Sequence, residues 1–300
     1  MIPFVQMPAF EYGRTDAVSP LIRRVIANNP GPFTFTGTGT YVVGRGEVGA
    51  GVAVIDPGPL DEAHLAALLA AVEGQTVSHV LVTHTHRDHA PLARPFAEAV
   101  GAPVLAALPP ARTVHASASL DADDDEAFAP DVVLTGGERL RGDGWTIEAL
   151  STPGHASNHM AFALVEENAL FSGDHVMGWS TTVVAPPDGD MAAYMASLDA
   201  VIGRGFSTIW PTHGAPITKP GPFLEAYKAH RLAREAQVLA RLAAGNRRIA
   251  DMVPVLYAAV DSRLWPAASL SVWAHLIALE RAGIVRATPG PAIDADWTLV

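Results

Sequence analysis

The chain has 300 residues, enough for one large domain or two smaller ones with a substantial core. An apolar share of 49 % and a charged share of 17 % are ordinary for a globular protein. The sequence contains no cysteine, which excludes disulfides, Cys-ligated zinc, iron–sulfur clusters and thiol nucleophiles together. Any metal must therefore be bound by His, Asp or Glu.

Charge is unevenly distributed along the chain, whose formal net charge is −11. Residues 1–214 carry 10 basic and 24 acidic side chains, whereas residues 215–300 carry 10 and 7. An acidic body argues against duplex DNA as a partner, because DNA-binding proteins draw their affinity from Lys and Arg on phosphates. The first twenty residues lack a signal-peptide pattern, and no eighteen uncharged apolar residues run together. We therefore expect a cytoplasmic protein with no membrane partner.

The first half of the chain alternates short β-branched runs with stretches rich in Ala and Leu, which predicts an α/β layered fold. Residues 40–43 and 51–55 have the pattern of strands, and the second ends at the turn sequence Asp-Pro-Gly-Pro. A helix over 64–72 then precedes residues 77–83, an apolar run typical of a buried strand.

The last part of the chain predicts a linker helix and a small winged-helix module. The linker helix extends from Pro222 to about Ala244, and two further helices over 249–260 and 267–282 precede a closing β-hairpin. The second of these helices offers only Arg281 to a DNA groove, so packing or a homodimer contact is the expected role of the module.

These patterns predict a catalytic domain over residues 1–218, a basic linker helix over 219–245 and a winged-helix-like domain over 246–300. Within the catalytic domain, the acidic stretch 121–126 lacks the spacing of an EF-hand and is expected to be a solvated loop.

The sharpest signal in the sequence is Thr-His-Thr-His-Arg-Asp-His over residues 83–89. Residues two apart in an extended segment project to the same side, so His84 and His86 can bind one ion where the strand ends. Asp88 and His89 then turn toward a neighbouring position. This spacing predicts a metal site rather than a set of ordinary core histidines.

Three more potential ligands follow strand-like runs in the same way: His155 after Thr-Pro-Gly, Asp174 after Ser-Gly, and His213 after Pro-Thr. In layered α/β proteins, loops at strand ends converge on the ligand site. Five imidazoles and two carboxylates suffice for two ions. Two cations that share a water would lower its pKa and make hydroxide the nucleophile, with Asp88 and Asp174 as the candidate catalytic residues.

Together these residues resemble the dinuclear hydrolase pattern of the metallo-β-lactamase superfamily, over roughly residues 35–218. The resemblance implies a four-layered αββα sandwich and two Zn²⁺ ions, with iron and manganese as alternatives. It also implies the ligand set: His84, His86 and His155 on one ion, Asp88, His89 and His213 on the other, and Asp174 between them.

The region after the metal motif resembles one branch of this superfamily, the branch that contains beta-lactamase-like protein 2. The resemblance rests on Thr-Pro-Gly-His-x-x-x-His-Met, Ser-Gly-Asp, Tyr194-x-x-Ser-Leu198, Ala-His-Arg231 and the winged-helix tail. It implies a zinc-dependent endonuclease that acts on single-stranded RNA. The alternative is a hydrolase of small esters, thioesters or lactones, which the acidic body and the breadth of the superfamily support.

Two differences between this sequence and the lactamases of the superfamily narrow the choice of activity. One class of lactamases in this superfamily uses a Cys ligand, which this chain lacks, and another class lacks the bridging carboxylate that Asp174 supplies. A true β-lactamase is therefore disfavoured. Flavodiiron relatives carry Glu where His86 stands, which disfavours a flavodiiron redox enzyme. The persulfide dioxygenases, which use one iron with a similar motif, are a less favoured alternative.

Several further side chains are candidates for contact with substrate or for support of the ligands: His159, His175, Tyr194 and Arg231. His159 could protonate a leaving group or hydrogen bond to a ligand, while His175 and Tyr194 could equally be packing residues. Asp56 either orients a ligand His or is an ordinary turn residue. The basic side chains of the linker, Arg231 among them, either border the cleft, where single-stranded RNA would bind, or are solvated helix charges.

Overall fold

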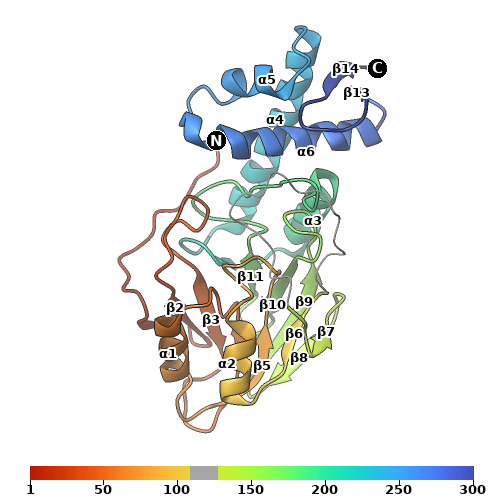
Figure 1. Ribbon diagram of the computed structural model, residues 1–300. Coiled ribbons are helices and arrows are strands. Elements are labelled where there is room, and N and C mark those ends of the chain that lie inside the picture. Colours follow the sequence, from red (N-terminus) through yellow and green to blue (C-terminus); the bar gives the residue numbers. More distant parts are fainter. Residues whose placement is uncertain (109–127) are drawn as a thin grey trace.

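The computed structural model describes residues 1–108 and 128–300 (Figure 1). The acidic stretch 121–126 lies outside the described residues. The body contains two β-sheets with helices on their outer faces, and a third, two-stranded sheet belongs to the C-terminal module.

The first sheet has seven strands in the order β1-β2-β3-β4-β5-β6-β7. The pairs from β1 to β4 are antiparallel and those from β4 to β7 are parallel. The strands are β1 (Thr15–Ala17), β2 (Ile22–Ile26), β3 (Gly39–Val43), β4 (Gly51–Ile55), β5 (Thr76–Leu81), β6 (Val104–Ala106) and β7 (Val132–Val133).

The second sheet has five strands in the order β12-β11-β10-β9-β8. Only the β11–β12 pair is parallel. The strands are β8 (Arg139–Gly142), β9 (Trp145–Ser151), β10 (Met160–Leu164), β11 (Ala169–Gly173) and β12 (Thr208–Pro211).

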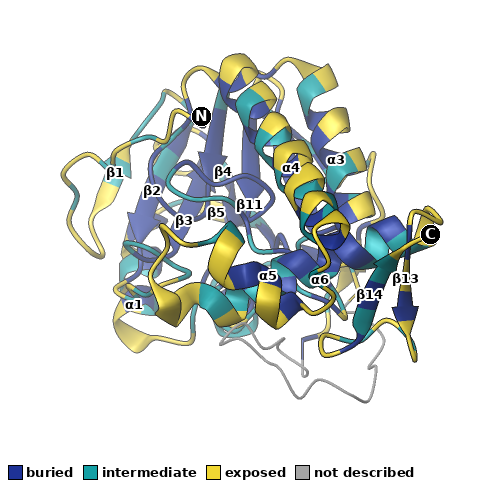
Figure 2. Cartoon of the chain, turned by 90° about the horizontal axis from the view of Figure 1, so that it is seen from above, coloured by how far each residue is buried: buried dark blue, intermediate teal, exposed yellow. Residues whose placement is uncertain are grey.

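The two sheets pack face to face because their strands alternate between two apolar surfaces. In β3, Tyr41 and Val43 join a cluster with Phe162 and Phe171 of the second sheet, whereas Val42 faces the opposite way. Figure 2 shows β3 buried throughout and β4 buried except at its first residue, and β5 is buried at its C-terminal end. This layer between the sheets is the centre of the αββα sandwich that the sequence predicts.

Helices cover both outer faces. α1 (Glu62–Ala71) and α2 (Ala93–Val100) pack on the first sheet, where Leu68 and Phe96 enter its outer cluster. α3 (Met191–Arg204) and the first half of α4 (Pro220–Ala243) cover the second sheet, with Leu198 and Tyr227 in a shared core. The predicted α/β sandwich is thus confirmed.

The C-terminal module has its own core around Trp297, which the far end of α4 shares through Val238. It contains α5 (Ile249–Leu256), a short 3₁₀ helix (Ser262–Leu264), α6 (Trp265–Arg281) and the hairpin β13 (Val285–Thr288) and β14 (Asp296–Leu299). Helix, helix and hairpin follow in the predicted order, and the module lies at one end of the body (Figure 1).

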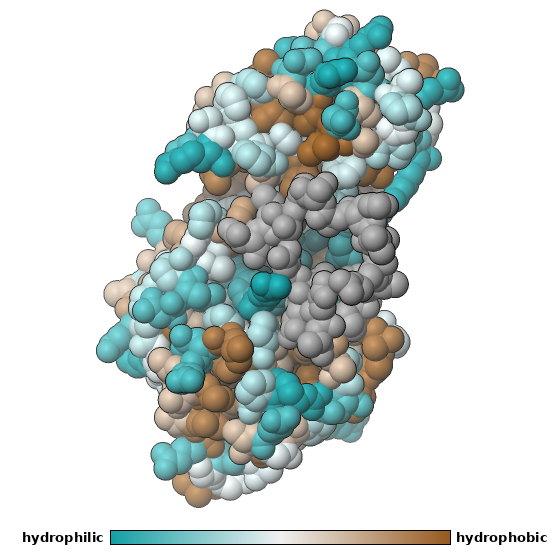
Figure 3. All heavy atoms as spheres, in the orientation of Figure 1, coloured by the Kyte–Doolittle hydropathy of each residue, from teal (hydrophilic) through white to brown (hydrophobic). Residues whose placement is uncertain are grey.

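Among the described residues, no helix is long and apolar enough to cross a membrane. On the face drawn in Figure 3, hydrophilic side chains are interspersed with apolar ones over both the body and the C-terminal module.

Candidate metal centre

Four loops converge at one edge of the sandwich, and they carry the seven predicted ligands. The loop after β5 supplies His84 to His89, and the loops after β9, β11 and β12 supply His155, Asp174 and His213. Each loop follows a strand of one of the two sheets, so the rigid sheets fix the loop ends that carry these side chains.

The first group consists of three histidines. Nε2 of His84 lies 2.9 Å from Nδ1 of His86, and Nε2 of His155 lies 3.2 Å from the same atom. These three ring nitrogens face one another within a radius suited to a single cation.

The second group consists of one carboxylate and two histidines. Oδ2 of Asp88 lies 3.0 Å from Nε2 of His213 and 3.5 Å from Nε2 of His89. The three atoms form a second set of donors that could hold a metal ion.

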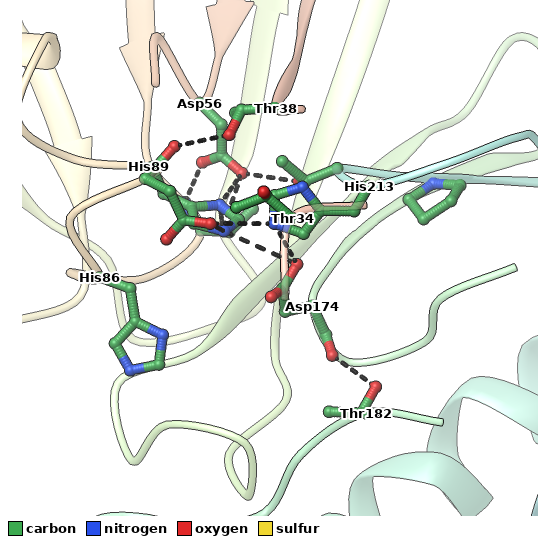
Figure 4. Close-up of polar contacts among 12 residues, drawn as sticks. Thr34, Thr38, Asp56, His86, His89, Asp174, Thr182 and His213 are labelled. Atoms are coloured by element: carbon green, nitrogen blue, oxygen red, sulfur yellow. Dashed lines mark hydrogen bonds and ion pairs between the residues drawn. The ribbon is translucent and has the colours of Figure 1, made fainter. Parts of the chain in front are cut away.

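Asp174 lies between the two groups and offers a different oxygen to each. Its Oδ1 is 3.4 Å from Nε2 of His213 and 3.6 Å from Nε2 of His89, whereas its Oδ2 is 3.8 Å from Nε2 of His155. Figure 4 shows Asp174 directed toward His89 and His213. A carboxylate in this position is suited to bridge two cations.

Three buried atoms, two from the second group and one from Asp174, fit a bound cation, because they have no hydrogen-bond partner among the described residues. They are Nε2 of His89, Nε2 of His213 and Oδ1 of Asp174. Buried polar atoms are normally hydrogen bonded, so an unpartnered cluster of donor atoms calls for an explanation. The His/Asp clusters as a whole are consistent with a dinuclear metal site.

The electrostatics of the two groups differ. In the first, burial lowers the pKa of His84 well below its ordinary value and that of His86 to about 3, so both imidazoles are neutral, as metal binding requires. In the second, burial lowers the pKa of His89, but the carboxylates of Asp88 and Asp174 outweigh burial and raise it well above normal. This negative potential favours a cation.

In four of the five predicted ligand histidines, the ring nitrogen that faces away from the centre also has a polar partner, which fixes the orientation of the ring. Their partners lie within 2.6 to 3.2 Å: Thr83 Oγ1 for His84, Asp56 Oδ2 for His89, the Val183 carbonyl for His155 and the Gly37 carbonyl for His213.

The sequence left open whether Asp56 orients a ligand histidine or is an ordinary turn residue, and its contacts decide between the two. Its carboxylate accepts hydrogen bonds from Thr83 N, Thr83 Oγ1 and Thr212 Oγ1, and lies 2.8 Å from Nδ1 of His89. The residue is fully buried and adopts a φ of +50°. It therefore contacts a predicted ligand rather than serving only as a turn residue.

His159, His175 and Tyr194 are buried behind the predicted ligands. The Asp174 N–H donates to Nε2 of His159, whose Nδ1 lies 2.8 Å from Thr152 Oγ1. Tyr194 donates its hydroxyl to the His175 carbonyl. Both ring nitrogens of His175 lack a hydrogen-bond partner among the described residues.

One basic side chain of α4 lies differently from either of the predicted arrangements. Arg231 is buried against the rings of Tyr194 and Tyr227 instead of bordering a cleft or facing solvent. Arg234 donates to the Leu256 carbonyl, and Lys228 pairs with Asp199 at 2.5 Å.

Sequence reasoning missed Thr182 and Val183, which contact Asp174 and His155. The only available signal was their place in an apolar run after the Asp174 loop, which does not distinguish them from core residues.

Comparison with known proteins agrees with this geometry. Residues 34–213 match the metallo-beta-lactamase superfamily, and residues 249–297 match the beta-lactamase associated winged helix domain. An atrochrysone carboxyl ACP thioesterase from Claviceps purpurea (strain 20.1) is 31 % identical over 250 residues, which cover 81 % of this chain and 74 % of the relative. A beta-lactamase-like protein 2 homolog from Caenorhabditis elegans is 30 % identical over 231 residues, covering 75 % and 72 %.

The solved structures show the same fold. A beta-lactamase domain protein from Burkholderia ambifaria superposes with a TM-score of 0.79 at 24 % identity and covers 100 % of this chain and 97 % of its own. The family match spans more than half of the chain and includes all seven predicted ligands. The chain therefore belongs to the metallo-beta-lactamase superfamily and is a metal-dependent hydrolase with a C-terminal beta-lactamase associated winged helix domain.

Proposed function

We propose that this protein hydrolyses acyl thioesters at a dinuclear zinc site. The observation that supports a thioester substrate is the similarity to an ACP thioesterase, which extends over 81 % of the chain. The thioester was part of the alternative reading of the sequence, and it now stands ahead of single-stranded RNA.

The proposed ligand sets are those implied by the family resemblance, and the donor atoms described above support them. Asp174 bridges, because its two oxygens face the two groups separately. His, Asp and the absence of Cys suit a borderline divalent ion, so Zn²⁺ is proposed, and iron and manganese remain alternatives for the same donors.

Two such ions, when bound, supply a hydroxide nucleophile at neutral pH and polarise the attacked carbonyl. The reaction adds the oxygen of water to the thioester carbonyl carbon, breaks the C–S bond and releases a carboxylic acid and a thiol. The protein's own contribution is to hold the ligand atoms still: Asp56 orients His89, and the N–H of Asp174 is held by His159.

The contacts of the linker helix weaken the RNA reading. Neutralising phosphates requires free Lys and Arg side chains. Lys228 is instead paired with Asp199, Arg231 is buried, and the guanidinium of Arg234 lies 4.0 Å from the ring centroid of Tyr257. Three of the basic residues that would have supported RNA binding, Lys228, Arg231 and Arg234, thus have partners within the chain.

The test compares the hydrolysis of several substrates by protein that has been shown to bind two zinc ions. Acyl-N-acetylcysteamine thioesters, the matching oxygen esters and lactones, and end-labelled single-stranded RNA are compared, with Asp174→Ala as the inactive control and Lys228→Gln as a charge control. We expect thiol release that requires Asp174 and changes less than about twofold in Lys228→Gln.

Cleavage of RNA that requires Asp174 and fades with salt, without thiol release from any thioester, would overturn the proposal. Faster cleavage of oxygen esters or lactones than of thioesters would keep the hydrolase and change its substrate class.

A further inference from the structure

The segment Thr182–Val183 joins two of the proposed metal ligands. The hydroxyl of Thr182 donates to the carbonyl of Asp174 at 2.7 Å. The carbonyl of Val183 lies 2.6 Å from Nδ1 of His155, the ring nitrogen that faces away from the centre. Figure 4 shows the Thr182 contact on the far side of Asp174 from His89. One short stretch of chain thus contacts both the backbone of the proposed bridging residue, Asp174, and the ring of His155, a proposed ligand of the first ion.

Helix α4 holds this stretch in place. The Thr182 N–H donates to the hydroxyl of Tyr227, and Arg231 donates to the Thr182 carbonyl. Tyr227 and Arg231 are four residues apart, so they project from the same face of the helix. Both backbone groups of Thr182 are therefore bound to α4, and its hydroxyl contacts the backbone carbonyls of Asp174 and His175 as well as the Tyr227 hydroxyl.

The burial of Arg231 indicates that its hydrogen bond to the Thr182 carbonyl is specific. The residue is 4 % exposed, and no ion pair joins it to a carboxylate within residues 1–108 and 128–300. Its guanidinium lies instead 4.9 Å from the ring centroid of Tyr194 and 5.7 Å from that of Tyr227. A buried cation without an anionic partner is costly, so an apolar residue would pack here more favourably if only packing mattered.

We infer that Thr182 is a positioning residue through which α4 sets the metal affinity of the centre. Arg231 and Tyr227 fix the backbone of Thr182, and Thr182 with Val183 fixes Asp174 and His155 relative to each other. Because the far half of α4 belongs to the core of the winged-helix domain, this contact also couples that domain to the metal site. The inference rests on the proposed dinuclear site but not on the substrate.

The experiment is zinc titration of metal-free protein in competition with a chromophoric chelator, together with the absorption spectrum of the Co²⁺-substituted form. Thr182→Val keeps the shape and the backbone bonds but removes the hydroxyl. We expect it to weaken zinc binding about 10- to 100-fold and to alter the cobalt spectrum, as loss of an orienting hydrogen bond does at other metal sites. Thr182→Ser, which restores the hydroxyl, is expected to bind zinc like the wild type.

Thr181→Val is the matched control, because it removes the same hydroxyl one residue earlier. Arg231→Met is expected to weaken zinc binding in the same direction, and its combination with Thr182→Val should cost less than the sum of the two, since both act through one contact. Arg231→Lys, which keeps the charge, replaces Arg231→Met in this experiment if the latter does not fold.

Wild-type zinc affinity and an unchanged cobalt spectrum in Thr182→Val would overturn the inference. Because zinc binding is measured without substrate, protein that behaves as expected here and yet cleaves no thioester would count against the proposed function alone.

Discussion

The carboxylate of Asp56 lies 2.8 Å from Nδ1 of His89, and this contact joins the end of β4 to the loop that follows β5. The same carboxylate accepts from Thr83 and Thr212, so it ties three loops of the centre together. A carboxylate at this position keeps a proton on Nδ1 of His89, so that Nε2 is the nitrogen that would bind a metal ion.

Asp56→Asn is expected to weaken zinc binding about 10- to 100-fold. An amide has one acceptor oxygen and one NH₂ group, so it cannot accept from all four of these donors. Chelator competition measures the effect. Asp199→Asn, which removes an exposed carboxylate paired with Lys228, is the matched control and should bind zinc like the wild type.

The three carboxylates around His89 also predict that zinc stabilises the fold. Each proposed site should add about 1.4 kcal/mol to the free energy of unfolding for every tenfold rise of free Zn²⁺ above its Kd. Denaturant unfolding over a series of buffered zinc concentrations gives the slope. Asp174→Ala should show the slope of at most one site; a slope equal to that of the wild type would contradict the bridging position of Asp174.

The buried His64 predicts a loss of stability in acid. Burial lowers its pKa to about 4, against 6.5 for the free side chain, so the folded state binds fewer protons than the unfolded state between these values. Its contribution is therefore complete above pH 6.5 and is lost as the pH falls toward 4. At pH 5 the loss amounts to about 2 kcal/mol.

Urea unfolding of the metal-free protein at pH 7 and pH 5 tests this. His64→Gln cannot take up the proton, so the difference between the two pH values should be smaller than in the wild type by about 2 kcal/mol. Equal differences in the two proteins would show that His64 does not contribute.

The seven proposed ligands were predictable because their signal is local. Alternation places His84 and His86 on the same side of an extended segment, Asp88 and His89 follow within three residues, and His155, Asp174 and His213 each come after a strand-like run. The layered fold and the winged-helix module followed in the same way from periodicity, with helix and strand ends within a few residues of those observed for β4, α4 and α6.

The supporting contacts were not predictable, because they depend on packing between distant segments. Thr182 and Tyr227 are 45 residues apart, and nothing local distinguishes Thr182 from Thr181. Arg231 has the sequence environment of a solvated helix charge, and only the position of α4 against Tyr194 buries it. The role of Asp56 was likewise open until the fold placed His89 beside it.

Gly154, the residue before His155, has a φ of +139°. A Cβ on residue 154 would lie 2.3 Å from Cα of Tyr194. The carbonyl of Gly154 accepts a hydrogen bond from the Asp190 N–H, so the loop cannot move away freely. Gly154→Ala should therefore destabilise the protein by about 2 kcal/mol or more and lower the zinc occupancy by displacing His155. Gly203→Ala, in α3 with open space around it, should instead stabilise by about 0.5–1 kcal/mol. Denaturant unfolding and zinc content measure both variants, and full zinc occupancy in Gly154→Ala would show that the His155 loop tolerates the added methyl group.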